Sequence, residues 1–458
     1  MMKLLGHICL GLLLLSTTPL WSQMNNTSTQ SALDVLGPGS SDDQMKTPPP
    51  VSGQSYPTQV TSEERSNYLR AGVAFTSAYT DNALGSLTGT PVSDESYSVG
   101  PTLALDETRS RLHFVLTYAP GFTFYQHTSS RNEADQNMSV DLNYRLSPHV
   151  TLSARDGFLK TSNVLNQQNF EPVGSVSGGT QEPNFSVITP IADVLSNSGN
   201  VGITYQFAAN GMVGVNGSFT NLHYPNPAEV PGLFDSNSQA GSAFYSFRFS
   251  KMNYIGATYQ YQRLIAYPTE GQSETQTHAL LFFYTLYATS KFSISFFGGP
   301  QHSDTIEPPQ PPLNIQLASV RAWTPAAGAS MSWQGRLNDI AVSYSHIISG
   351  GGGLIGAVQL DSASASFRQQ MTQRLSGSLA AAYAQNDVLA SAFAAGNNGH
   401  TVSGTAALQQ QIGPHINLQL GYTRLHQSYT SVAVLAGTPD TNLEFVSISY
   451  QFSRPLGR

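Results

Sequence analysis

The segment 442–452 limits the possible folds more than any other part of the chain. Its side chains alternate strictly between apolar and polar. The apolar face carries Val446, Ile448, Tyr450 and Phe452, and the polar face carries Ser447, Ser449 and Gln451. Successive side chains of a β-strand point to opposite faces, so this segment is predicted to be a strand with one apolar side. That side would face a core in a soluble sandwich, or lipid in a membrane barrel.

The same pattern recurs from residue 68 onward as a series of hairpins. Polar loops alternate with tight turns, and strands of ten or more residues lie between them. We place the tight turns at residues 106–110, 146–149, 208–210, 250–253, 288–291, 335–339, 371–373 and 412–415. Residues 146–152 and 412–418 are near copies, which indicates hairpin duplication.

These hairpins predict an all-β fold, a transmembrane antiparallel up-and-down β-barrel. Soluble sandwich strands are usually five to six residues long, whereas roughly ten tilted residues are needed to cross a bilayer. Alternating short and long connections are typical of outer-membrane barrels. Eight turns join sixteen strands, and one strand at each end brings the count to about 18, within a range of 16–18.

Two segments fit the pattern less well. Pro325 interrupts the strand predicted at 316–333, because proline removes a backbone donor from the sheet. Residues 378–395 are rich in alanine and could support a helix. We predict a strand pair there, because Leu379 and Tyr383 keep the two-residue step.

The beginning of the chain predicts export. Lys3 and a short apolar run at 8–15 indicate a signal peptide, residues 1–23. Residues 24–66, rich in Ser, Thr, Gln and Pro, are expected to be a disordered periplasmic tail, and residues 67–458 the barrel. The single cysteine, Cys9, lies within the signal peptide, so the mature chain has no disulfide.

Composition excludes several classes of function. Only 11% of residues are charged, against about 25% in ordinary domains, and the net charge is -7 without a basic patch, so no nucleic-acid partner is expected. The scattered histidines do not have metal-ligand spacing, and the glycine run at 350–353 lacks the Lys-Ser/Thr of a phosphate loop. We therefore expect no enzyme activity, cofactor or metal. A barrel-embedded lipase is a minor alternative, since no nucleophile-elbow motif is recognisable.

Aromatic residues gather near strand ends. Such bands are typical of the girdles at the two lipid–water interfaces, although aromatic residues also favour strands in general. We assign Tyr144, Phe207, Phe249, Tyr287 and Trp333 to the band at the tight turns. We assign Tyr79, Tyr125, Tyr224 and Tyr267 to the band at the long loops.

With its signal peptide, hairpin series and terminal Tyr450-Gln451-Phe452, the chain resembles the porin-like β-barrels of the bacterial outer membrane, some of which accompany exopolysaccharide systems. Residues 152–158 are also similar to that group. The resemblance covers roughly residues 68–452 and departs from the pattern at 453–458, beyond the terminal aromatic residue. It implies a Gram-negative host, an outer-membrane location, folding with periplasmic chaperones, and Tyr450 and Phe452 as a signal for the barrel-assembly machinery.

The predicted inward face is mostly Ser, Thr, Asn, Gln, Gly and Ala, which suits a weakly selective channel for small hydrophilic solutes. Alternation places eight charged residues in the lumen at the periplasmic mouth, either as tolerated charges at wet strand ends or as a ring that tunes selectivity. They are Arg70, Asp106, Arg111, Asp141, Arg145, Arg248, Arg368 and Arg374.

The longest loop, 161–196, follows the fifth strand. In general porins the equivalent loop narrows the channel, so the resemblance suggests that Glu171, Glu182 and Asp193 lie at a constriction. A surface loop is an equal alternative.

Two other functions share most of these features. One is a barrel that exports a secreted polysaccharide, and the other is a structural or adhesive surface barrel without a conducting lumen. A TonB-dependent transporter is disfavoured because residues 24–67 are too polar to form a plug domain, and an autotransporter because no passenger segment precedes the barrel.

Overall fold

The computed structural model describes residues 45–46, 48, 67–84, 91–163, 165, 192–268, 271–289, 291–306, 319–350, 357–389, 399–429 and 440–456. All of them belong to the larger of two units, residues 35–458. The predicted signal peptide lies outside the described residues. None of the described helices is long and apolar enough to cross a membrane.

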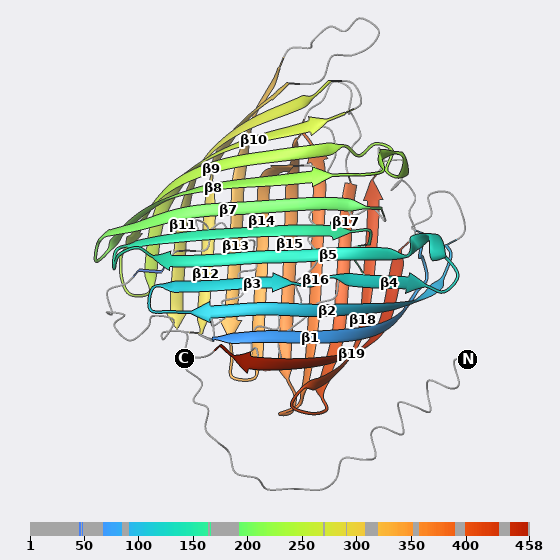
Figure 1. Cartoon of the computed structure of the whole chain (residues 1–458). Coiled ribbons are helices and arrows are strands. Elements are labelled where there is room, and N and C mark those ends of the chain that lie inside the picture. Colours follow the sequence, from blue (N-terminus) through green and yellow to red (C-terminus); the bar gives the residue numbers. More distant parts are fainter. Residues whose placement is uncertain are drawn as a thin grey trace, which may run out of the picture. The chain divides into compact units, whose positions relative to one another are not determined.

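The described residues form one antiparallel sheet that closes on itself (Figure 1). Its strands are β1 (Tyr68–Thr80), β2 (Asp94–Thr108), β3 (Leu112–Tyr118), β4 (Gly121–Tyr125), β5 (Glu133–Arg145), β6 (Val150–Thr161), β7 (Val194–Ala208), β8 (Gly211–His223), β9 (Asp235–Arg248), β10 (Asn253–Tyr267), β11 (Ser273–Thr289), β12 (Phe292–Ile306), β13 (Val320–Gln334), β14 (Asn338–Gly350), β15 (Ala357–Gln370), β16 (Leu375–Val388), β17 (Gly399–Gln411), β18 (Ile416–Tyr429) and β19 (Thr441–Pro455). Two short 3-10 turns, η3 (Ser129–Arg131) and η5 (Pro227–Glu229), lie in the connections.

The ring closes where the first strand meets the last. β1 pairs with β2 on one side and with β19 on the other, over the whole length of β1. Figure 1 shows β1 in blue beside β19 in dark red. Elsewhere each strand pairs with the strands before and after it in sequence, with β3 and β4 together between β2 and β5, so the described strands form a ring without a free sheet edge.

The wall contains eighteen strands, because β3 and β4 are successive parts of one strand. Both pair with β2 and with β5. Pro120 separates them, since it has no amide proton to donate to the ladder. The fold therefore confirms the predicted eighteen-stranded antiparallel barrel.

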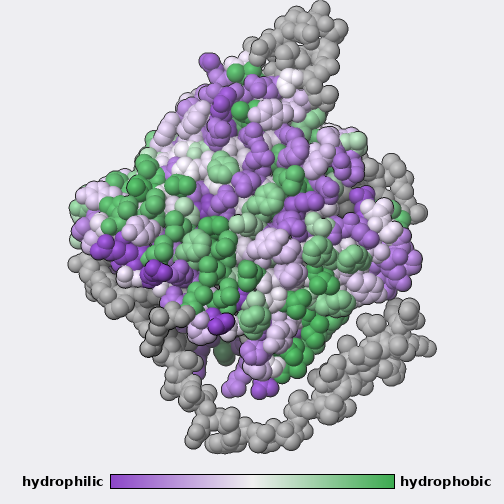
Figure 2. Space-filling view, viewed as in Figure 1, coloured by the Kyte–Doolittle hydropathy of each residue, from purple (hydrophilic) through white to green (hydrophobic). Residues whose placement is uncertain are grey.

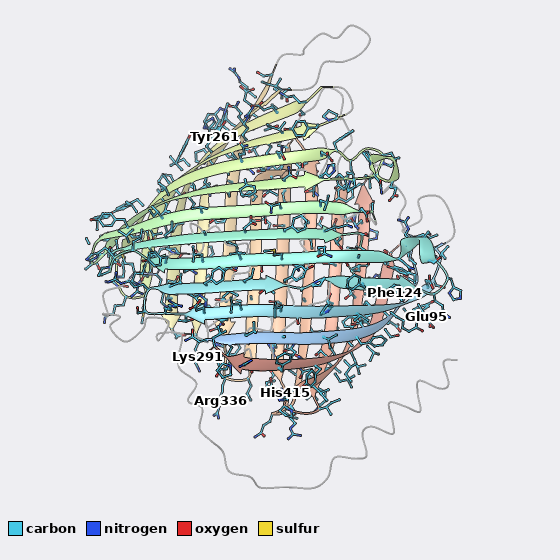
Figure 3. All side chains as sticks on the ribbon, in the orientation of Figure 1. Glu95, Phe124, Tyr261, Lys291, Arg336 and His415 are labelled. Carbon is cyan, nitrogen blue, oxygen red and sulfur yellow. The ribbon has the colours of Figure 1, made fainter. Side chains whose placement is uncertain are left out.

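All eight short connections occur where the turns were predicted, and they define one end of the barrel, called here the turn end. Figure 3 shows Lys291, Arg336 and His415, from three different turns, gathered at this end. The strand ends that lead into the long connections, near Glu95 and Phe124 in Figure 3, define the opposite loop end. Both the start of β1 and the end of β19 lie at the turn end.

The strand predicted at 316–333 is present as β13, and Pro325 does not interrupt it. Pro325 stands directly opposite Pro300 of β12. The β11–β12 ladder skips Gly299 and Pro300, and the β13–β14 ladder begins only at Ala327. Pro300 is therefore unpaired on its β11 side, and Pro325 is unpaired on its β14 side. Each proline lacks its amide proton at a position where no ladder hydrogen bond is lost on that side.

The alanine-rich segment also differs from the prediction of a strand pair. β16 is a single strand that ends at Val388, and residues 390–398 lie outside the described residues. It pairs with β15 and β17 over nearly its full length. Pairing on both sides overrides the helix propensity of its alanines.

Candidate functional site

The two faces of the wall have different chemistry. In β11, Thr275, Thr277 and Thr285 face inward and are at most 2% exposed, whereas Leu280 and Phe282 face outward and are 42% and 58% exposed. Figure 2 shows groups of hydrophobic side chains, with polar ones between them, on the face of the wall turned to the viewer. The wall therefore separates an apolar exterior from a polar interior.

Hydroxyl groups on neighbouring strands pair across the inner face. The Thr275 and Thr305 hydroxyls lie 3.0 Å apart, and those of Thr285 and Ser295 lie 2.7 Å apart. The same contact joins Thr76 to Ser447, Ser293 to Ser332, Ser343 to Ser364, Ser345 to Ser362 and Thr405 to Thr423. Such a pair gives each hydroxyl a hydrogen-bond partner on the wall itself, without a bulky side chain in the lumen.

Aromatic rings on the inner face lie over glycines of the next strand. Phe445 is the direct cross-strand partner of Gly421, and a Cβ added to Gly421 would come within 2.2 Å of the ring. The same arrangement joins Phe244 to Gly214, Phe283 to Gly256, Phe297 to Gly328 and Tyr429 to Gly399. Because each ring covers backbone, large side chains line the wall while the lumen keeps its width.

Several predicted lumen charges lie close together. Arg70 of β1 and Asp106 of β2 face inward on neighbouring strands, two residues out of register, since Asp106 stands opposite Tyr68. Asp106 also lies 3.5 Å from Nε2 of His113. Arg111 lies in the β2–β3 turn, where its carbonyl accepts the amide of Arg145 at 2.7 Å.

Asp141 has a partner that sequence reasoning missed. Nε and an Nη of Arg155 donate to its two carboxylate oxygens at 2.6 and 3.1 Å. The inward parity of β6 could have identified Arg155, since it faces Asp141 in the β5–β6 register.

The other three predicted charges have different surroundings. Arg248 is 8% exposed, and its guanidinium donates to the Asn210 side chain and to the Ala209 carbonyl at 3.2 and 2.7 Å. Arg368 faces Asp339 across β14 and β15. Arg374 is exposed in the β15–β16 turn.

The loop end of the lumen holds an apolar cluster, called here the outer-mouth cluster. Its members are Ala192, Tyr224, Val230, Leu233, Val358 and Tyr429, all 0–3% exposed. Tyr224, Val230 and Leu233 come from the β8–β9 connection, whereas Val358 and Tyr429 belong to β15 and β18, on the opposite side of the ring. The cluster therefore crosses the mouth.

Polar contacts hold both sides of this cluster in place. The Tyr429 hydroxyl is 2.8 Å from Asn386 Nδ2 and 3.0 Å from the Thr401 hydroxyl. On the other side, the Tyr224 amide donates to Asp235 at 2.8 Å, and Gly232, with a positive φ of 95°, lies beside Leu233 in the same connection. Burial raises the pKa of Tyr224, so its phenol stays neutral.

The β14–β15 hairpin adds to this closure. Pairing between β13 and β14 stops at His346, and beyond it Ile347 packs near Ala279 and Leu281 of β11. The Ile348 amide donates to the Gln301 side chain at 3.2 Å, and Ile348 clusters with Leu264 of β10. The loop end of β14 thus contacts strands beyond its own neighbours.

The predicted constriction loop is described only at its ends. Glu171 and Glu182 lie outside the described residues. Asp193 accepts a hydrogen bond from the Ser162 hydroxyl, and the adjacent Ala192 belongs to the outer-mouth cluster. Sequence reasoning missed the contribution of the β8–β9 connection, whose apolar Val230 and Leu233 are its clearest signal.

Three aromatic residues assigned to the girdles face elsewhere. Tyr125 and Tyr224 are 6% and 2% exposed, and Tyr287 faces inward. Asn163 Nδ2 lies 3.5 Å from the Tyr125 hydroxyl, and Tyr224 belongs to the outer-mouth cluster. Contacts with residues distant in sequence therefore bury both rings. Other members are exposed on the outside, including Tyr79, Phe207 and Tyr267.

Tyr450 and Phe452, the predicted assembly signal, lie on the outward face of β19 and are 48% and 46% exposed. β19 continues past them to Pro455, which pairs with Tyr68. Among the described residues, no group of three or more His, Cys, Asp or Glu side chains could hold a metal ion.

No protein-family model matches the chain, and no curated protein matches it in sequence. Among solved structures, OccK2 (OpdF) of Pseudomonas aeruginosa is similar with a TM-score of 0.41 and 8% identity, over 85% of this chain and 98% of that one. OpdQ of the same organism is similar with a TM-score of 0.38 and 11% identity, over 84% of this chain and 98% of that one. The ferric citrate transporter FecA is similar with a TM-score of 0.41 and 9% identity, over 82% of this chain and 63% of that one.

Proposed function

We propose that this protein is an outer-membrane channel of a Gram-negative bacterium, through which small hydrophilic solutes diffuse. The observation that carries the proposal is the opposite chemistry of the two faces of a closed wall. Outward side chains such as Val201 and Phe282 are 56% and 58% exposed, which suits lipid. The inner face carries paired hydroxyls, which suit water and polar solutes, and its aromatic rings lie flat over the backbone.

The charges of the inner face support weak selectivity. Arg70, Arg145, Arg155, Arg248 and Arg368 occupy inward positions, with Asp106, Asp141 and Asp339 as their acidic counterparts. The close Arg155–Asp141 pair leaves little net charge at its position. The excess of arginine at the turn end favours a weak preference for anions.

The outer-mouth cluster supports a narrow entrance for the channel. Its residues bridge opposite sides of the ring, so they limit the size of solute that passes. The same observation favours a second candidate, a structural barrel whose lumen does not conduct. Export of a polysaccharide is a third function that fits the same wall.

Liposome swelling with sugars of graded size separates these candidates. A channel for small solutes admits monosaccharides and excludes long oligosaccharides. Passage of long oligosaccharides would support the export function instead. A folded, heat-modifiable barrel that admits no sugar would support the structural function.

We further propose that β19 is recognised by the barrel-assembly machinery and periplasmic chaperones through Tyr450 and Phe452. Both rings are exposed on one face of the last strand. Replacing both by Ala should lower the amount of heat-modifiable barrel in outer membranes. Replacing the outward Tyr422 of β18, which is 40% exposed, is the matched control and should have a smaller effect.

A further inference from the structure

A short segment that precedes the barrel lies against the inner wall at the turn end. The Met45 amide donates to the Gln206 side chain at 3.0 Å, and the Lys46 amide lies 3.4 Å from the Tyr254 hydroxyl. The Lys46 ammonium is 4.7 Å from the centre of the Tyr287 ring. These residues belong to a region whose composition predicted a disordered tail.

The side chain of Met45 adds an apolar contact. It packs against the cluster of Met212, Phe244 and Phe283, which are 2–5% exposed. All three face inward from β8, β9 and β11. Thioether contacts with aromatic rings are favourable, and methionine adapts to irregular surfaces.

The wall residues in contact with this segment form a continuous surface. They come from five consecutive strands, β7 to β11, and include an acceptor on Gln206, a hydroxyl on Tyr254 and a ring face on Tyr287. Tyr254 and Tyr287 meet edge to face, with centres 5.5 Å apart at 81°. The Tyr254 hydroxyl and the Tyr287 ring face therefore both contact Lys46, one through its backbone amide and the other through its ammonium.

Three different kinds of contact therefore meet at Met45 and Lys46. One is a backbone hydrogen bond, one is apolar packing and one is a cation over an aromatic face. We propose that the inner wall of β7–β11 is a binding surface for this chain's own N-terminal segment, anchored by Met45 and Lys46. Met45 and Lys46 occupy part of the turn-end mouth, and they narrow the channel if the proposed function holds.

Cross-linking tests the binding surface without reference to transport. In a Cys9→Ser chain, which has no other cysteine, Met45→Cys is combined with Met212→Cys and treated with a short bifunctional thiol reagent. The matched control combines Met45→Cys with Val213→Cys, the next residue of β8, which faces outward and is 36% exposed. An intramolecular cross-link to position 212 but not to 213 is expected. Equal yields, or no cross-link at 212, would overturn the proposal.

Conductance tests the narrowing. Met45→Ala combined with Lys46→Ala should raise the single-channel conductance of the full chain, because the segment then loses both anchors. Lys291→Ala, which removes a lysine from an exposed turn at the same end, is the control and should leave conductance unchanged. A cross-link at 212 with unchanged conductance would overturn the narrowing but not the binding surface. Absence of any channel would overturn the proposed function alone.

Discussion

The hydroxyl of Tyr429 accepts a hydrogen bond from the side-chain amide of Asn386 at 2.8 Å, at the point where the loop end of the lumen closes. The two residues are 0% and 2% exposed. This contact fixes a large ring on one side of the barrel, and residues from the opposite side pack in the same cluster. The entrance of the lumen is thus held by side chains as well as by the sheet.

Replacing Tyr429 should widen that entrance. Tyr429→Ala removes the ring from the outer-mouth cluster, so larger sugars should enter liposomes that contain the variant. Tyr429→Phe keeps the ring and should preserve the size limit, at a cost of about 1 kcal/mol for the lost hydrogen bond. An unchanged size limit in the alanine variant would show that the cluster does not control passage.

The rings that cover glycines should be sensitive to one added methyl group. In Gly421→Ala the three atoms nearest the new Cβ are ring atoms of Phe445, at 2.2 to 2.9 Å, so the ring must move toward the lumen. We expect a lower conductance and a loss of stability of about 1–3 kcal/mol, as for overpacking elsewhere.

Gly157→Ala is the control for this change, because its new Cβ would lie 3.6 Å from the nearest atom, the Ser198 hydroxyl. Combining Gly421→Ala with Phe445→Leu should restore conductance, since the smaller side chain leaves room for the methyl group. If Gly421→Ala conducts like the parent protein, the flat ring does not set the width of the lumen.

The arginines at the turn end should set the sign of ion selectivity. Arg111→Ala and Arg145→Ala together remove two positive charges from neighbouring positions, so the reversal potential in a salt gradient should shift toward cations. Arg424→Ala is the control, because Arg424 faces outward and pairs with Asp440. An unchanged reversal potential after the double substitution would argue against a selectivity ring.

The two faces of one strand should respond differently to a charge. Val201, at the middle of β7, faces outward and is 56% exposed, so Val201→Arg should destabilise the barrel in lipid by about 2–4 kcal/mol. Thr204→Arg, on the inward face of the same strand, should cost less because water is available. Urea unfolding in lipid vesicles measures both, and equal losses would contradict the assigned faces.

Local pattern was sufficient for the architecture. A period of two in side-chain polarity decides which face each residue occupies, and short turns mark the hairpins that join the strands. Pro325 was misjudged because a proline in a strand is harmful only where its missing amide proton has a paired neighbour. That depends on the register of β12, β13 and β14, which the sequence of β13 alone does not contain.

The parts that sequence missed depend on contacts between distant segments. Tyr224 and Tyr429 are 205 residues apart in the sequence, yet both are buried in one cluster across the mouth. Their positions beside long loops are equally typical of a lipid interface. Met45 and Lys46 lie in a polar region with no periodicity, so the sequence alone does not distinguish them from the rest of the predicted tail. Their contacts with the inner wall do.

The most direct test of the account is the current through single molecules of the refolded full chain in a planar bilayer. A water-filled polar lumen predicts discrete, ohmic conductance steps with weak ion selectivity. A correctly folded, heat-modifiable barrel that inserts into lipid but passes no current, in the parent protein and in Tyr429→Ala alike, would contradict it.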